Sequence, residues 1–110
     1  MSEDFEAWEA HFELHGQRDY PSLVALCERG VASMPGDLFA LERLGEAYVL
    51  NGQYQKALDT IGQFHHQHPD LRCFQHIILD ALFAMGKTED DYPWESRPEV
   101  LRIGSKVWLY

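Results

Sequence analysis

A regular spacing of helix-ending residues constrains the fold of this chain more than any other feature. The interval from Pro35 to Pro69 equals the interval from Gly52 to Gly86. Proline and glycine commonly end helices, so this shared interval marks repeated helix boundaries. Apolar residues recur at helical intervals between these boundaries. The spacing therefore predicts helical hairpins of about 34 residues that bury their apolar faces by stacking on one another.

The same signals place five helices in the first part of the chain, up to Gly86. Pro21 suits the first turn of a helix, where a missing N–H costs little, and Asp37 suits an N-cap. Gly16, Gly52 and Gly86 suit the positions that follow helix C-termini. The predicted helices cover residues 3–15, 21–34, 38–51, 53–68 and 71–85.

The helical pattern breaks after Gly86, where a sixth helix is due. Residues 87–97 are acidic and rich in turn formers, and they predict a loop. Ser96 to Glu99 resembles a capping box with Pro98 at the first helical position, which predicts a last helix over 99–110. The alternating apolar residues of 101–109 also permit a strand. Tyr92 and Trp94 either contact a partner or fill the open end of the helical stack, and the second reading is favoured.

Residues 38–69 carry a pattern that resembles a tetratricopeptide repeat. Small residues stand at Gly45 and Ala57, where two helices of such a repeat cross closely. The resemblance extends over residues 3–86, with departures at Glu9, Gly30 and Leu79. The matching residues of the best repeat are Leu41, Leu44, Gly45, Tyr48, Gly52, Tyr54, Ala57, Ile61, Phe64 and Pro69.

The resemblance implies an all-α fold, a right-handed stack of helical hairpins in a single domain, 1–110. Its repeats are expected at about 3–35, 37–69 and 70–110, with a loop at 87–97. The third repeat is degenerate, and a C-terminal capping helix closes the stack. Terminal repeats are commonly atypical, so the departures do not oppose the resemblance.

The resemblance also implies a protein–protein interaction module, such as an adaptor, chaperone or assembly factor. The first helix of each pair would line a concave groove that is acidic with apolar positions. Such a groove suits a basic or apolar segment of a partner; alternatively, these acids are an ordinary solvated face. The implied groove residues are Glu6, Glu13, Phe39, Glu42, Arg43, Glu46, Val49, His76, Asp80 and Phe83, with Ala10 and Cys73 beside them.

Two other functions are kept as alternatives. The apolar residues 107–110 would suit a homodimer, and the chain would also suit a regulatory part of a larger enzyme. No serine-hydrolase, phosphate-loop or dinucleotide-binding motif is present, which argues against catalysis and against a cofactor. His11 and His15 have the spacing of two zinc ligands, but the sequence fixes no third ligand. His65, His66 and His68 are expected to favour the C-terminal end of a helix.

Charge and cysteine content bear on partners and compartment. The net charge of −9 opposes binding to nucleic acid and to anionic membranes. No apolar run reaches the roughly 20 residues of a membrane-spanning helix. Cys27 and Cys73 form no CxxC motif and predict reduced thiols, with a disulfide between them as the lesser alternative. A cytoplasmic protein is expected.

Overall fold

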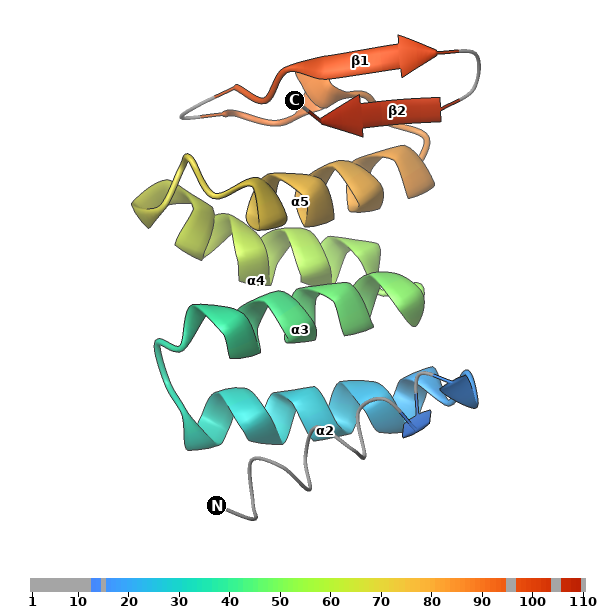
Figure 1. The fold of residues 1–110 in the computed structure, drawn as a ribbon, viewed down its shortest axis with the longest axis vertical. Helices are drawn as coiled ribbons and strands as arrows, with labels where there is room; N and C mark the ends of the chain where they lie inside the picture. The colour runs from blue at the N-terminus through green and yellow to red at the C-terminus, as the bar shows by residue number, and fades with distance from the viewer. Residues whose placement is uncertain (1–12, 15, 95–96, 104–105, 110) are drawn as a thin grey trace. The chain divides into compact units, whose positions relative to one another are not determined.

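A computed structural model describes residues 13–14, 16–94, 97–103 and 106–109 (Figure 1). The chain divides into two compact units, Met1–Gln53 and Tyr54–Tyr110. The division falls between Gln53 and Tyr54, inside the predicted repeat 37–69. The predicted pairing of 38–51 with 53–68 therefore stays a prediction, as does the single domain. The predicted helix at 3–15 lies almost wholly outside the described residues.

The first unit contains a pair of packed helices, α2 (Tyr20–Ser33) and α3 (Leu38–Leu50) (Figure 1). Asp19 caps α2 by accepting a hydrogen bond from the Ser22 amide at 3.3 Å. Asp37 caps α3 as predicted, because its carboxylate accepts from the amides of Phe39 and Ala40 at 2.9 and 3.1 Å. A cap of this kind stabilises a helix by about 1 kcal/mol. Since only residues 34–37 separate the helices, α3 folds back along α2.

The second unit contains a second packed pair, α4 (Tyr54–Gln67) and α5 (Arg72–Ala84). The link between them contains Pro69, as the sequence predicts. The buried Gln75 side chain donates to the Pro69 carbonyl at 2.9 Å, which fixes this link to the start of α5.

The two regularly spaced glycines end α3 and α5 in the same way. Gly52 and Gly86 have φ of 76° and 77°, which glycine adopts without the steric cost that other residues carry. In the first cap the Gln53 amide donates to the Tyr48 carbonyl at 2.8 Å, and in the second the Lys87 amide donates to the Leu82 carbonyl at 2.9 Å. Both arrangements are Schellman motifs. The predicted periodicity is thus present in the local structure of two helix ends.

The chain after α5 begins with a loop, as predicted. A short 3-10 helix, η1 (Glu89–Asp91), contacts α5. Thr88 and Asp91 form its capping box, with the Thr88 amide donating to Asp91 Oδ2 at 2.8 Å. Asp90 pairs with Arg97 farther along the loop.

The predicted C-terminal capping helix is wrong. Residues 100–103 and 106–109 form an antiparallel pair of strands, β1 (Val100–Ile103) and β2 (Lys106–Leu109), in which Leu101 lies opposite Trp108 (Figure 1). β-Branched and aromatic residues favour strands, and two such runs separated by Gly104-Ser105 are a hairpin signal. The capping-box signal at 96–99 is local and carries no information about strand pairing, which explains the error.

The helical prediction is confirmed over residues 20–84. Among the described residues, the buried apolar side chains recur at helical intervals along each helix, as predicted. No described helix is both long and apolar enough to cross a membrane. The buried apolar side chains are Leu23, Val24, Cys27, Leu41, Leu44, Ala47, Tyr48, Ala57, Leu58, Ile61, Phe74, Ile77, Ile78, Leu79, Ala81 and Leu82.

Ile78, which is fully buried on α5, provides a test of this core. We expect Ile78→Ala to lower the free energy of unfolding by about 2–5 kcal/mol, because it removes buried methyl groups and leaves a cavity. Ile78→Val keeps most of that volume and should cost about 0.5–1.5 kcal/mol. Urea unfolding followed by circular dichroism measures both values. Equal stability of Ile78→Ala and the wild type would contradict the assigned core.

Candidate protein-binding surface

The predicted binding residues of the first unit form a stripe on α3. Phe39, Glu42, Arg43, Glu46 and Val49 recur every three or four residues and so share one side of the helix. All five are exposed or partly exposed, whereas the opposite side is buried. The sequence thus identified correctly which side of α3 faces away from the core.

An aromatic ring, a guanidinium and a carboxylate are in contact along this stripe. Phe39 is 48% exposed, the largest exposed fraction among the large apolar residues that the structure describes. The Arg43 guanidinium carbon lies 4.7 Å from the centre of the Phe39 ring, within the range of a cation–π contact. Arg43 also donates to Glu46 Oε2 at 3.3 Å. The helix therefore orders these side chains at its surface.

Leu50 belongs to the same surface, although the sequence reasoning missed it. It is 39% exposed and closes α3. Phe39 and Leu50 lie eleven residues apart, which is about three helical turns, so they fall on nearly the same line along α3. Counting three turns from Phe39 would have found it. We call Phe39, Arg43, Glu46 and Leu50 the α3 line.

A part-buried hydrogen bond ties α3 to α2. The hydroxyl of Tyr48, a buried residue, donates to Glu28 Oε2 at 2.9 Å. Burial and the Glu28 carboxylate raise the pKa of Tyr48 to about 12. Burial also raises the pKa of the Cys27 thiol to about 11, with Arg43 opposing the rise and Glu46 and Glu28 adding to it. Both groups are therefore neutral at pH 7.

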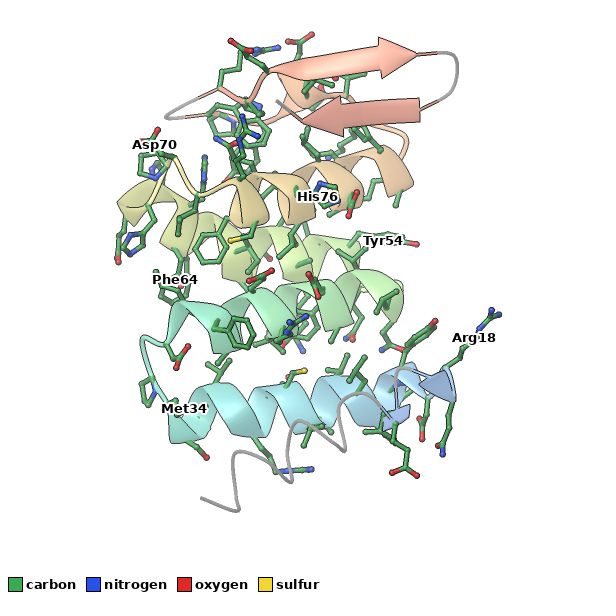
Figure 2. All side chains as sticks on the ribbon, in the orientation of Figure 1. Arg18, Met34, Tyr54, Phe64, Asp70 and His76 are labelled. Carbon is green, nitrogen blue, oxygen red and sulfur yellow. The ribbon has the colours of Figure 1, made fainter. Side chains whose placement is uncertain are left out.

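The predicted residues of the second unit form a shorter stripe on α5. His76, Asp80 and Phe83 share one side of the helix, and His76 lies on its middle part (Figure 2). His76 Nε2 lies 3.4 Å from Asp80 Oδ2, and both side chains are more than half exposed. Burial raises the pKa of the Asp80 carboxyl, and His76 opposes that rise. Phe83 is partly exposed.

The remaining residues that the sequence predicted as binding residues or metal ligands give little evidence for a site. Glu13 is exposed and accepts a hydrogen bond from Gln17 at 3.3 Å. Glu6 and Ala10 lie outside the described residues, as do the histidines proposed as zinc ligands, His11 and His15. Within the described part of the chain, no three side chains of metal-binding type come together. Neither cysteine forms a disulfide; Cys27 is buried and Cys73 partly exposed.

Tyr92 and Trp94 pack on α4, where they contact His65 and lie close to Gly62. That they fill the open end of a helical stack stays a prediction. The Trp94 indole donates to the Glu89 carbonyl at 2.7 Å. The Trp94 ring lies edge-on to the imidazole of His65, with ring centres 5.4 Å apart. The ring centres of Tyr92 and Trp94 are 4.7 Å apart. His65 is therefore a buried residue at 1% exposure, which the expected role at the helix end did not anticipate. Burial raises the pKa of the Tyr92 hydroxyl.

Gly62 makes room for this aromatic contact. A Cβ at position 62 would lie 2.9 Å from the Tyr92 hydroxyl but 3.9 Å from the ring carbon that bears it. We expect Gly62→Ala to stabilise a Tyr92→Phe variant by about 0.5–1 kcal/mol, because alanine favours a helix over glycine. In the wild type, Gly62→Ala must displace the Tyr92 hydroxyl. The substitution should therefore stabilise the wild type less than it stabilises Tyr92→Phe, or should destabilise it.

The measurement for this pair is a double-mutant cycle from urea unfolding of the four proteins. The two substitutions should be coupled by about 0.5 kcal/mol or more. Purely additive effects would contradict the contact between Gly62 and Tyr92.

The raised thiol pKa of Cys27 predicts a loss of stability at alkaline pH. The ordinary thiol value is 9.0 and the folded value is about 11. Below pH 9 the thiol is protonated in both states and adds no pH dependence. As the pH rises from 9 to 11 the unfolded chain ionises first, so the free energy of unfolding falls, by about 2–3 kcal/mol.

Cys27→Ala tests this assignment. We expect its free energy of unfolding, measured by urea between pH 8 and 11, to fall less steeply above pH 9 than that of the wild type. Tyr48, whose pKa rises from 10.0 to about 12 on folding, also lowers the stability above about pH 10, but it does so in both proteins. The difference between the two curves therefore isolates Cys27. Parallel curves would show that Cys27 is not the responsible group.

Comparison with known proteins gives no relative on which to base a function. No family model matches the chain, and no curated protein or solved structure matches it. The resemblance to tetratricopeptide repeats therefore stays a prediction, and the geometry of the described residues has to support any function.

Proposed function

We propose that this protein is a protein–protein interaction module that holds a basic or apolar segment of a partner, as an adaptor, chaperone or assembly factor would. The proposal includes a tetratricopeptide-like stack in which the first helices of the pairs line a concave groove. The matching Schellman motifs at Gly52 and Gly86 support that arrangement. A cytoplasmic location is part of the proposal, and the absence of a disulfide at Cys27 and Cys73 suits a reducing compartment.

The observation that carries the proposal is the exposed aromatic side chain of Phe39 beside the carboxylates of α3. An exposed phenylalanine at a helix surface favours contact with another apolar group, since burying it would contribute about 1.5–3 kcal/mol. Glu42 and Glu46 outnumber Arg43, which leaves one net negative charge beside the ring. The whole chain carries −9, so it would attract cationic segments and repel acidic ones.

Selection of displayed random peptides on the full chain tests the proposal. We expect the recovered sequences to be rich in Lys, Arg and apolar residues and poor in Asp and Glu. Phe39→Ala should weaken the recovered peptides by about 10- to 100-fold in fluorescence anisotropy, because it removes a buried apolar contact.

A pair of charge-reversal variants controls for net charge. The double variant Glu42→Lys, Glu46→Lys should weaken binding and reduce its dependence on salt. Asp70→Lys with Glu99→Lys changes two exposed acids of the second unit by the same charge and should leave binding almost unchanged. An acidic recovered pool, or equal effects of the two double variants, would overturn the proposal.

A further inference from the structure

We infer that the segment held on α3 is itself an amphipathic helix, with two apolar side chains eleven residues apart and Lys or Arg between them. This inference rests on the proposed function and specifies the conformation of the partner segment. Its basis is the order of side chains on the α3 line, which is apolar at both ends and charged in the middle.

The two apolar ends of the α3 line set the spacing of the partner's contacts. Phe39 and Leu50 are 48% and 39% exposed. Eleven residues of helix rise by about 16 Å, and they complete about three turns, so both side chains project from the same side of α3. A partner that covers both must present two apolar groups about 16 Å apart on one side.

A helix meets this requirement and an extended segment does not. In a helix lying along α3, residues eleven apart have the same rise and the same direction. In an extended segment a distance of about 16 Å spans about five residues, and side chains five residues apart point to opposite sides. A helix also satisfies its own backbone hydrogen bonds, whereas an extended segment would need backbone partners that the side of a helix does not offer.

The charges between the two apolar ends select the middle of the partner helix. Glu46 lies between Phe39 and Leu50, and Glu42 flanks the line. Arg43 stacks on Phe39 and pairs with Glu46 at 3.3 Å, and one guanidinium beside two carboxylates leaves a net negative charge. Glu46 lies seven residues from Phe39 and four from Leu50. A lysine or arginine of the partner at the level of Glu46 would therefore face these carboxylates, seven residues from the contact with Phe39 and four from the contact with Leu50.

Three synthetic peptides, each about 18 residues or five helical turns long, test the inference by fluorescence anisotropy with the full chain. The first has leucines eleven residues apart with two lysines between them on an alanine-rich helix. The second moves one leucine so that the pair is nine residues apart, half a turn off the line. The third keeps the first spacing but carries a central proline, which breaks the helix.

The first peptide should bind best. The other two should bind about 10- to 100-fold more weakly, because each loses one apolar contact or the helix that aligns both. Leu50→Ala should weaken the first peptide by about tenfold or more. Met34→Ala is the matched control, because Met34 is 41% exposed but lies in the link after α2, outside the α3 line (Figure 2).

The outcomes separate this inference from the proposed function. If the proline peptide or the shifted peptide binds as well as the first, or if Leu50→Ala has no effect, the partner is not a helix on this line. The inference is also wrong if the first peptide does not bind while display-selected peptides bind in a Phe39-dependent way. In that case the proposed function still stands. If no peptide binds in a Phe39-dependent way, both are overturned.

Discussion

Burial of apolar stripes between consecutive helices is the interaction on which the described structure depends. In the first unit α2 and α3 bury one side each, and in the second unit α4 and α5 do the same. Short helices of 13 or 14 residues have little stability in isolation, so most of their stability comes from this packing. The polar contacts at helix ends and between helices fix the geometry of the pairs. The Tyr48–Glu28 hydrogen bond joins α3 to α2, and the Gln75–Pro69 bond joins α5 to its own link.

The same packing creates the surface that we propose as functional. One side of α3 is buried in the core. The residues of the α3 line lie on the opposite side and are therefore exposed or partly exposed: Phe39, Arg43, Glu46 and Leu50. The aromatic residues after α5 behave differently, since Tyr92 and Trp94 cover His65 and Gly62 of α4. They therefore contribute to the second unit as covering side chains, and the candidate binding surface lies elsewhere, on α3.

Local signals predicted most of the helical part correctly. Asp37, Gly52, Gly86 and Pro69 act through their own backbone or a neighbouring amide, so their effect can be read from a few adjacent residues. The outward residues of α3 were those that the resemblance to a tetratricopeptide repeat had implied. The C-terminal helix failed because Ser96 to Glu99 gave a local helix signal, while the pairing of Val100–Ile103 with Lys106–Leu109 depends on two segments meeting.

The sequence by itself determined the positions of four helices, the Asp37 cap and the helix ends at Gly52 and Gly86, since these depend on contacts within one or two helical turns. Only the tertiary structure decided that His65 is buried beneath Tyr92 and Trp94 and that Gly62 accommodates the Tyr92 hydroxyl. It also decided that residues 100–103 and 106–109 form paired strands. Each of these results depends on which segments pack or pair with one another, and the signals of a single helix do not specify that.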